Sequence, residues 1–279
     1  MMNKNTLLAL GFASALSVAS ASVVLAADAH APQPPRQSWS FSGPFGKFDK
    51  AQLQRGFKVY REVCQACHSM QLVAFRTLGQ AGALGFTEGQ IKTIAGEYQI
   101  NDGPNDSGEM FQRPGRPSDY FPPIYPNEQA ARATHNGALP VDLSVIAKAR
   151  TYEVGFPGFL IDIVRQYQEN GVDYIHALLT GYGEPPAGEQ LSAGQHWNNF
   201  FPGHKIAMAP PLDKDRVEYT DGTPQTVDQY ARDVTAFLMW AAEPHLESRK
   251  RIGFQVMIFL IVFAGLAYFT KKKIWASAH

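Results

Sequence analysis

The sequence has 279 residues, of which 45% are hydrophobic and 18% charged, and this composition excludes a disordered polyelectrolyte as well as a small disulfide-stabilised protein. The formal net charge is zero, but residues 28–248 hold 18 of the 25 bases and all 25 acids, which gives them a net charge of −7. Because nucleic-acid binding needs a basic surface, we expect no nucleic-acid partner, whereas an acidic body would suit a basic protein.

The N-terminal segment is typical of an export signal. It holds one base (Lys4), no acid, an apolar run from Leu7 to Leu25 and small residues at its end. We predict a signal peptide over residues 1–27 that is cleaved close to Asp28, with a retained N-terminal anchor as the alternative. A single base and the lack of arginine argue against a mitochondrial transit peptide and favour bacterial export.

The next hundred residues mix an arm, a helix and loops. Residues 28–48 are rich in proline and aromatic residues and predict an extended arm that lies over a surface. Residues 49–70 predict a helix with one buried face, because their apolar residues recur at helical spacing. These apolar residues are Leu53, Phe57, Tyr60 and Val63. Residues 79–126 are rich in Gly, Pro, Asn and Asp and predict a long irregular segment with short helical stretches at most.

Three short helices are predicted further along the chain. They cover residues 139–151, 158–170 and 172–180. Gly171 and Gly181 stand where helices commonly stop, since glycine adopts the left-handed conformation without strain.

A loop over residues 182–222 precedes the last helix of the body. Thr223 and Pro224 are typical of an N-cap and a first helical residue, and the helix should end before Pro244. The alternation that marks strands is absent, so the predicted fold class is mainly α and loop-rich, with one domain over residues 28–248. Because so much irregular chain packs poorly by itself, we expect a large bound cofactor to supply the missing core.

The C-terminal segment, residues 249–279, predicts a membrane anchor. Residues 252–269 carry no charge, and a helix of that length is about 27 Å long, just enough to cross a hydrocarbon core. Three bases precede this span and three follow it, so the positive-inside count is tied. The predicted signal peptide therefore sets the orientation, with residues 28–248 outside and a short basic tail in the cytoplasm.

The two cysteines stand in the motif Cys64-Gln65-Ala66-Cys67-His68. This pattern is typical of a c-type haem attachment site. Two thiols at the end of a helix can reach the two vinyl groups on one porphyrin edge, and His68 then lies under the iron as the proximal ligand. A thioredoxin-like pair needs a βαβ context, a zinc site needs two further ligands, and a disulfide needs no histidine. The sequence therefore predicts one haem c, bound covalently.

The residues alone do not decide which side chain is the sixth ligand of the iron. The candidates are His135, His176, His196, His204, Met110 and Met208. Met70 is too close in sequence to reach the opposite face of the haem, and Met239 lies in the predicted last helix. Met208 lies in a loop that the prolines after it stiffen, which favours Met208, with His204 next.

Several longer segments resemble a known family. They are Cys64–His68, Tyr125–Arg132, Asn136–Ser144, Asp173–Ile175, Leu179–Tyr182, Ile206–Leu212 and Trp240–Pro244, followed by a single C-terminal span. In these segments the chain resembles the cytochrome c1 family, the haem subunits of the quinol:cytochrome c oxidoreductase (bc1 complex), in their bacterial form. The resemblance covers nearly the whole chain after the signal peptide.

The resemblance implies further haem contacts. It implies Met208 as the sixth ligand, Asn136 and Pro140 as residues that line the haem, and Arg150 near a propionate. One departure is Val141, which stands where the family often has the second proline of Pro-Pro-Asp-Leu-Ser. Some bacterial members also carry a second cysteine pair that clamps the loop around the haem. This sequence has no cysteines left for that pair, so it does not show what holds the Met208 side of the haem in place.

A close helix crossing is also predicted. Gly56 lies four residues before Tyr60 in the first helix, and the last helix carries Phe237 and Trp240. A glycine so placed lets two helices cross closely, although it could also be a simple weak spot in its helix. The crossing resembles the terminal helices of the class I cytochrome c fold.

The implied function is electron transfer. The resemblance implies a subunit that is not catalytic alone, accepts an electron from the Rieske iron–sulfur protein and passes it to a soluble c-type cytochrome. Its other implied contacts are the cytochrome b subunit and membrane lipid, in a bacterial inner membrane with the haem domain on the periplasmic side. The alternatives are a free-standing membrane-anchored electron shuttle and an anchored haem peroxidase with an open sixth position.

Overall fold

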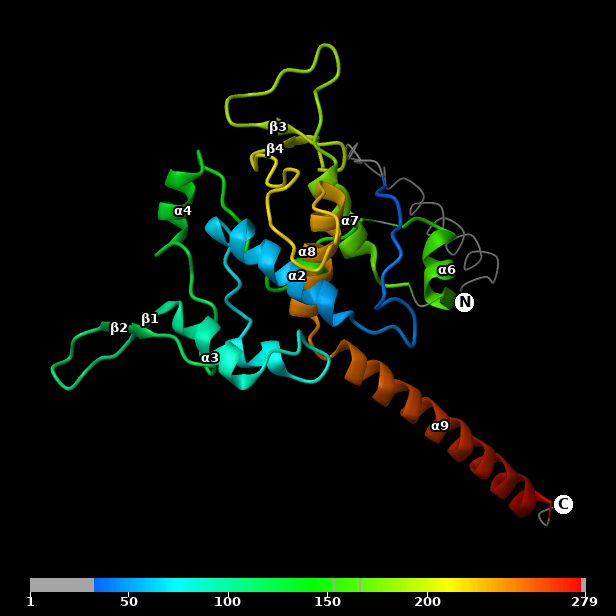
Figure 1. Cartoon of the computed structure of the whole chain (residues 1–279). Helices are drawn as coiled ribbons and strands as arrows, with labels where there is room; N and C mark the ends of the chain where they lie inside the picture. The colour runs from blue at the N-terminus through cyan, green and yellow to red at the C-terminus, as the bar shows by residue number, and fades with distance from the viewer. Residues whose placement is uncertain (1–32, 153, 166, 277–279) are drawn as a thin grey trace, which may run out of the picture. The chain divides into compact units, whose positions relative to one another are not determined.

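The computed structural model describes residues 33–152, 154–165 and 167–276 (Figure 1). The predicted signal peptide, residues 1–27, lies outside the described residues. The helices are α2 (Lys50–Glu62), α3 (Glu88–Gly96), α4 (Glu128–Thr134), α5 (Ile146–Ala149), α6 (Gly158–Arg165), α7 (Asn170–Thr180), α8 (Val227–Ala242) and α9 (Leu246–Trp275). Two 3₁₀ turns, η1 (Cys64–Ala66) and η2 (Phe75–Gly79), and four short strands, β1 (Gln99–Asp102), β2 (Phe111–Pro114), β3 (His196–Trp197) and β4 (Lys205–Ile206), complete the elements. The predicted mainly α, loop-rich class is confirmed.

Helices α2 and α8 cross near the centre of the described part (Figure 1). The Asp49 carboxylate caps α2 by accepting hydrogen bonds from the backbone amides of Ala51 and Gln52, at 2.9 and 3.2 Å. Further along α2, Gly56 lies against the backbone of α8. A Cβ atom built on Gly56 would lie 2.1 Å from the carbonyl oxygen of Asp233, so only glycine fits there. The close crossing predicted from Gly56 is confirmed.

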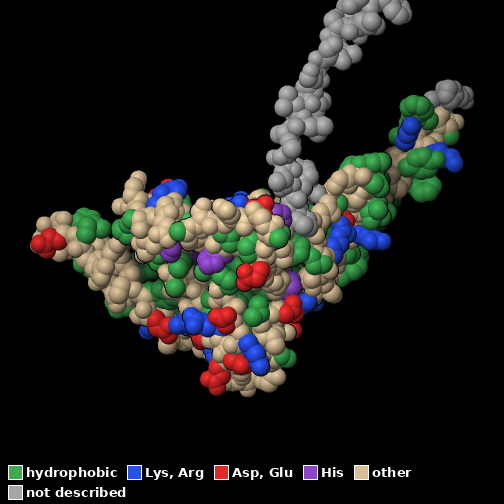
Figure 2. All heavy atoms as spheres, turned by 90° about the horizontal axis from the view of Figure 1, so that it is seen from above, with side chains coloured by type: hydrophobic (Ala, Val, Ile, Leu, Met, Phe, Trp, Pro, Cys, Tyr) green, Lys and Arg blue, Asp and Glu red, His purple; other side chains and the backbone are tan. Residues whose placement is uncertain are grey.

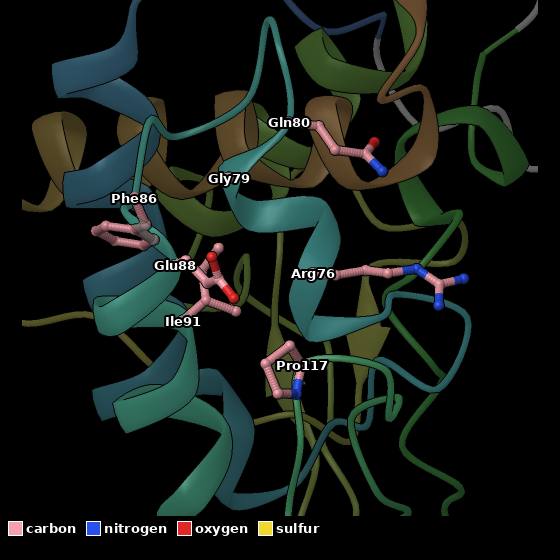
Figure 3. Close-up of a pocket in the computed structure, with 7 residues that line it drawn as sticks. All are labelled: Arg76, Gly79, Gln80, Phe86, Glu88, Ile91 and Pro117. Atoms are coloured by element: carbon pink, nitrogen blue, oxygen red, sulfur yellow. The ribbon is translucent and has the colours of Figure 1, made fainter.

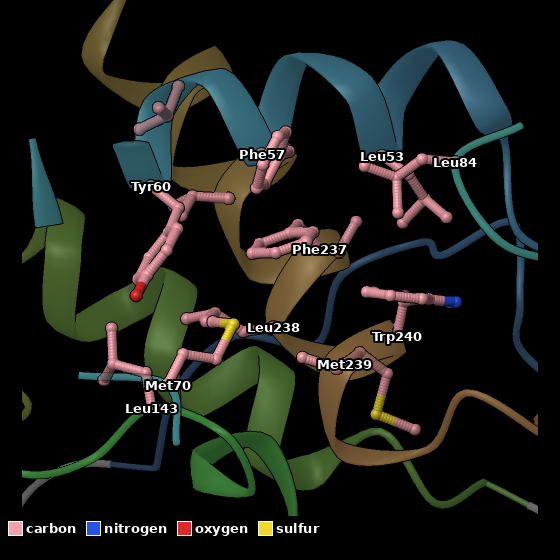
Figure 4. Close-up of a cluster of buried hydrophobic side chains, with 14 of the residues drawn as sticks. Leu53, Phe57, Tyr60, Met70, Leu84, Leu143, Phe237, Leu238, Met239 and Trp240 are labelled. Atoms are coloured by element: carbon pink, nitrogen blue, oxygen red, sulfur yellow. The ribbon is translucent and has the colours of Figure 1, made fainter. Parts of the chain in front are cut away.

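An aromatic core surrounds this crossing (Figure 4). The rings of Phe57 from α2 and Phe237 from α8 lie 5.4 Å apart, and Phe237 stacks on Trp240 at 5.7 Å. Phe75 and Phe121, from segments outside the two crossing helices, extend the core with ring centroids 4.4 Å apart. The described residues therefore bury an aromatic core around the crossing, and a further contribution of a bound cofactor to the core stays a prediction.

Two small antiparallel pairs of strands lie in segments whose sequence shows no strand pattern. Strand β1 pairs with β2, with Gln99 opposite Pro114, and β3 pairs with β4, with His196 opposite Ile206. Strands of four and two residues are too short for an alternating pattern to be recognised in the sequence. The first pair lies within the segment that was predicted to be irregular.

Helix α8 begins three residues later than predicted. Thr226, and not Thr223, is its N-cap, and the Thr226 hydroxyl oxygen accepts a hydrogen bond from the backbone amide of Gln229 at 3.2 Å. The backbone amide of Thr223 instead donates to the carboxylate of Asp221 at 3.0 Å, in the preceding loop. Both threonines are good caps by residue type, so only the three-dimensional contacts distinguish them.

The helix predicted over residues 139–151 shortens to the four residues of α5. The Asp142 carboxylate accepts a hydrogen bond from the backbone amide of Ser144, and this local bond competes with helix formation. Gly171, predicted as a stop, is instead the second residue of α7. A Cβ atom at Gly171 would lie 2.0 Å from the carbonyl oxygen of Ala147, so this glycine lets α7 approach α5.

The N-terminal arm packs on the body along residues 33–48. The indole nitrogen of Trp39 donates to the carboxylate of Asp173 in α7 at 2.9 Å. The ring of Phe41 is completely buried and stacks on Trp39 at 5.5 Å. The extended arm over a surface is confirmed for these residues.

Helix α9 contains the predicted span, residues 252–269. Its most apolar stretch has a mean hydropathy of 2.3 and is not buried by the rest of the protein. Figure 2 shows its apolar surface between two groups of basic side chains. Among the described residues α9 is the one helix long and apolar enough to cross a membrane.

Candidate haem site

The motif residues lie on a tight turn at the end of α2. The turn η1 begins at Cys64, and Cys67 follows as its C-terminal residue. The carbonyl oxygen of Cys64 accepts hydrogen bonds from the backbone amides of Cys67 and His68, at 3.2 and 2.9 Å. Since a 3₁₀ helix has three residues per turn, side chains three residues apart lie on the same side. The two free thiols are therefore suited to two bonds with one edge of a porphyrin.

The imidazole of His68 is oriented by a backbone carbonyl. Its Nδ1 lies 2.7 Å from the carbonyl oxygen of Val141. Because a carbonyl oxygen only accepts, Nδ1 carries the proton and Nε2 keeps its lone pair for a metal ion. Burial lowers the pKa of His68, which favours this neutral form. The acceptor belongs to the backbone, so valine in place of the second family proline leaves this hydrogen bond intact.

Asp142 fastens the Val141 segment to the motif turn. Its carboxylate accepts hydrogen bonds from the Ser69 hydroxyl at 2.9 Å and from the backbone amides of Gln71 and Ser144, both at 2.8 Å. Burial alone would raise the pKa of Asp142, but these hydrogen bonds, the one from Gln71 first, hold it below its usual range. The sequence analysis did not predict a role for Asp142. The one hint in the sequence is that Asp142 directly follows Val141 in a motif shared with the family.

Tyr125 and His135 lie on the same side of the site. The Tyr125 hydroxyl and Nε2 of His135 share a hydrogen bond of 2.7 Å, and the two rings meet edge to face. Tyr125 interacts electrostatically with Cys67, and His135 interacts with His68. Burial raises the pKa of Cys64 to about 12, so this thiol is neutral. A neutral thiol and the neutral thioether that would replace it both suit these surroundings.

Met208 lies on the loop after β4 and is half-buried. Its carbonyl oxygen accepts a hydrogen bond from the Tyr182 hydroxyl at 3.1 Å. At the base of the loop, the buried Asn198 donates from its side-chain amide to the carbonyl oxygen of Leu178 at 2.7 Å. The backbone amide of Asn198 also donates to the carbonyl oxygen of His204 at 2.8 Å. These hydrogen bonds brace the Met208 loop without a second cysteine pair.

The other predicted haem contacts lie on separate loops. Asn136 follows α4 with a φ of 52°, and its side-chain nitrogen lies 3.2 Å from the place that a Cβ of Gly194 would take. Pro140 directly precedes the carbonyl group that orients the motif histidine. Arg150 is exposed and interacts electrostatically with Tyr174 in α7. Pro140 is thus the sequence neighbour of the residue that contacts His68, and contacts of Pro140, Asn136 and Arg150 with a haem stay predictions.

The alternative histidine ligands His176 and His204 both make contacts within the fold, and of the two only His176 has its Nε2 in a hydrogen bond. His176 is buried between α7 and α8, with its Nε2 3.0 Å from the Asp228 carboxylate. Nδ1 of His204 lies 3.1 Å from the carbonyl oxygen of Asn198, and its ring stacks on Trp197 at 4.8 Å. These contacts give His204 a role within its loop.

The placement of the methionines favours Met208. Met70 and Met239 are fully buried in the aromatic core (Figure 4). Met110 lies between β1 and β2 and is exposed. Met208 is therefore the half-buried candidate on a braced loop.

A surface hollow in the described part is separate from this site (Figure 3). It is lined by Arg76, Gly79, Gln80, Phe86, Glu88, Ile91 and Pro117. None of the predicted haem residues lines this hollow. The candidate haem site is therefore defined by the motif turn and its hydrogen bonds, and not by this hollow.

Comparison with known proteins decides the family. The sequence model of the Cytochrome C1 family matches residues 39–278, which include the motif turn, the Met208 loop and α9. The chain belongs to the cytochrome c1 family. Members of this family are haem-bearing electron-transfer subunits of the bc1 complex. The two thiols on one side of a turn and the unprotonated Nε2 of His68 fit the haem that the family implies.

Individual relatives of the cytochrome c1 family are similar over most of the chain. The chain is 57% identical over 248 residues to cytochrome b/c1 of Bradyrhizobium diazoefficiens, a match that covers 88% of this chain and 36% of that protein. It is 51% identical over 244 residues to cytochrome c1 of Blastochloris viridis, with 87% and 86% covered. It is 47% identical over 248 residues to the mitochondrial cytochrome c1 heme protein of Saccharomyces cerevisiae, with 88% and 74% covered. The chain thus spans about a third of the length of the first of these relatives.

Proposed function

We propose that this chain is the electron-transfer subunit of a quinol:cytochrome c oxidoreductase and binds one haem c covalently through Cys64 and Cys67. Nε2 of His68 and the thioether of Met208 would hold its iron. The hydrogen bond between Nδ1 of His68 and the carbonyl oxygen of Val141 carries the proposal, because it leaves Nε2 available beside two free thiols. Around the haem, Asn136, Pro140 and Arg150 are the proposed lining residues, with Arg150 near a propionate.

The proposed ligands set the direction of electron flow. A bound haem supplies one-electron redox chemistry. A thioether ligand such as that of Met208 favours the reduced iron and raises the potential, whereas a second imidazole lowers it. The proposed donor is the Rieske iron–sulfur protein, and such centres have potentials up to about +300 mV. His68 and Met208 would give a bound haem a potential suited to this donor, and the proposed acceptor is a soluble c-type cytochrome.

The protein holds both ligands in place through backbone contacts. Val141 fixes the tautomer and the direction of the His68 ring, and Asp142 ties the Val141 segment to the motif turn. Tyr182 and Asn198 hold the Met208 loop through hydrogen bonds to backbone carbonyl oxygens. Rigid ligands need little rearrangement when the iron changes its charge, which suits rapid electron transfer.

The acceptor side of the proposal rests on charge. Residues 101–248 carry 20 acids and 10 bases, whereas residues 28–100 carry five acids and eight bases. An acidic surface attracts a basic partner before contact and raises the rate of association. We therefore assign the acidic half a role in steering a basic soluble cytochrome c.

The anchor defines the proposed location. Residues 1–27 serve as a cleaved signal peptide, residues 28–248 form the haem domain on the periplasmic side, and residues 249–279 anchor it. The length and hydropathy of α9 and the basic residues at both its ends support the anchor. In the bacterial inner membrane, α9 contacts lipid and packs beside the cytochrome b subunit.

Carbon monoxide binding tests the closed site against an anchored peroxidase. The reduced protein with two strong axial ligands should not change its optical spectrum under carbon monoxide. A peroxidase with an open sixth position would bind the gas and shift the spectrum. Purification in detergent distinguishes the remaining alternative, because a free-standing shuttle would not stay with a quinol-oxidising assembly.

A further inference from the structure

Helix α6 presents a group of apolar side chains to solvent. We define the α6 patch as Phe159, Leu160, Ile161, Ile163 and Val164 of α6, together with Phe156 two residues before the helix. Val164 is 83% exposed, Phe156 is 80% exposed and Ile163 is 67% exposed. Single exposed apolar residues are common on proteins, but a group of them on one short segment of the chain marks an interaction surface.

The orientation of α6 is fixed by its buried acidic residue, Asp162. Asp162 is 7% exposed and points to the body, where its carboxylate lies 2.7 Å from the guanidinium of Arg36 in the arm. The same guanidinium lies over the ring of Tyr167 at 4.6 Å, and the Tyr167 hydroxyl donates to the Asp173 carboxylate in α7. With Asp162 held inward by these contacts, the apolar side chains on both sides of it face outward.

The α6 patch belongs to the end of the body from which the membrane helix leaves. Glu169, four residues after α6, interacts electrostatically with Lys250, two residues before the apolar span. The Lys250 ammonium also donates to the carbonyl oxygen of Phe41 in the arm at 2.5 Å. In Figure 1, α6 lies on the same side of the body as the arm and the beginning of α9.

A second apolar contact lies where the apolar span of α9 begins, between Phe45 and Phe254. Phe45, at the turn of the arm, is 70% exposed and packs edge to face on Phe254 with ring centroids 5.5 Å apart. Phe254 is the third residue of the predicted span, and the bases Arg249, Lys250 and Arg251 directly precede that span. Basic side chains at the end of a span mark the level of the lipid headgroups. Apolar side chains from α6 and from the arm therefore gather at the membrane boundary.

We propose that the α6 patch and Phe45 insert into the headgroup boundary of the lipid bilayer, so that three separate segments hold the haem domain on the membrane. The inference rests on the membrane anchoring by α9 that forms part of the proposed function. A lipid surface accepts a wide apolar face, and the α6 patch includes three consecutive helical residues that point in directions about 100° apart. A groove on a protein would instead take a single stripe of residues spaced three or four apart. The pattern of α6 therefore favours lipid over a partner subunit.

Cysteine labelling tests this surface in the full-length holoprotein. The variants Val164→Cys and Phe156→Cys are reconstituted alone into phosphatidylcholine nanodiscs and treated with a membrane-impermeant maleimide. Met110→Cys, on the exposed loop between β1 and β2, is the matched control. We expect Val164→Cys and Phe156→Cys to react at least about tenfold more slowly than Met110→Cys, because lipid excludes the water-soluble reagent. The haem spectrum of each variant reports that the protein is intact.

The outcomes separate lipid from other partners. Protection of both α6 variants in nanodiscs that hold this chain alone supports the proposal. If the α6 variants react as fast as the control in these nanodiscs but are protected in the intact complex, a protein partner covers α6 and the proposal is overturned. Fast reaction in both samples shows a surface open to water and overturns it as well. Labelling of the wild-type chain at Cys64 or Cys67 would contradict the haem attachment and leave the test of α6 untouched.

Discussion

The crossing of α2 and α8 predicts a strong and specific effect of Gly56→Ala. The added Cβ would lie 2.1 Å from the carbonyl oxygen of Asp233 and 2.7 Å from the Cβ of Phe237. Ordinary contacts between such atoms are about 3.5 Å or longer, so the two helices would have to separate by roughly 1 Å. Extra methyl groups in a packed core cost about 1–3 kcal/mol, and this site lies at the upper end because backbone atoms cannot turn away.

The net loss of stability is smaller than the clash alone. Alanine is the better helix former and returns about 1 kcal/mol, so Gly56→Ala should lower the free energy of unfolding by about 2 kcal/mol. For a domain of this size that loss corresponds to a fall in Tm of about 4–8 °C. The assay is thermal unfolding of the full-length holoprotein in detergent, followed by far-UV circular dichroism.

The matched control is Gly89→Ala in α3. A Cβ atom at Gly89 meets nothing within 4 Å, and the residue is exposed. The same change at Gly89 should therefore leave the free energy of unfolding unchanged or raise it by up to about 1 kcal/mol, so Tm should not fall. If Gly56→Ala matched or exceeded the wild-type Tm, the close crossing would not be a feature of the folded protein and the reasoning would fail.

Three further predictions concern the ligand, the acceptor and pH. Met208→Leu should let the reduced haem bind carbon monoxide and His204→Ala should not; the reverse pattern of optical spectra would refute the ligand assignment. The rate of association with a basic soluble cytochrome c, measured by stopped flow, should fall steeply as salt rises past about 0.1 M, and a salt-independent rate would remove the steering role. Burial lowers the pKa of His176 in spite of Asp228, so the unfolded chain takes up that proton first and stability falls as the pH drops below about 6.5. His176→Gln should therefore lose less Tm than the wild type between about pH 7 and pH 5, and an equal loss in both proteins would contradict this origin.

Local features of the fold were predictable from the sequence because short-range patterns determine them. The spacing of Leu53, Phe57 and Tyr60 predicted the first helix, and Gly56 predicted the close crossing on α8. The uncharged run of residues 252–269 predicted the apolar helix α9. In each case the signal lies within one helix or in one residue type with a special geometry.

The remaining features depend on contacts between distant segments. The hydrogen bond between His68 and Val141 spans 73 residues, and its acceptor is a backbone atom that no residue type reveals. The brace of the Met208 loop by Asn198 likewise needs the fold, since an isolated asparagine in a loop carries no pattern. The aromatic core also draws Phe121 from a segment with no periodicity.

The mass of the purified full-length chain tests the central claim most directly. After denaturation in organic acid, a haem held by thioether bonds stays with the polypeptide, whereas a haem held only through His68 and Met208 is released. We predict that the wild-type chain stays heavier by one haem and that the paired variant Cys64→Ser/Cys67→Ser loses this mass. A wild-type chain with the mass of the bare polypeptide would contradict covalent attachment at the motif turn and with it the proposed electron-transfer site.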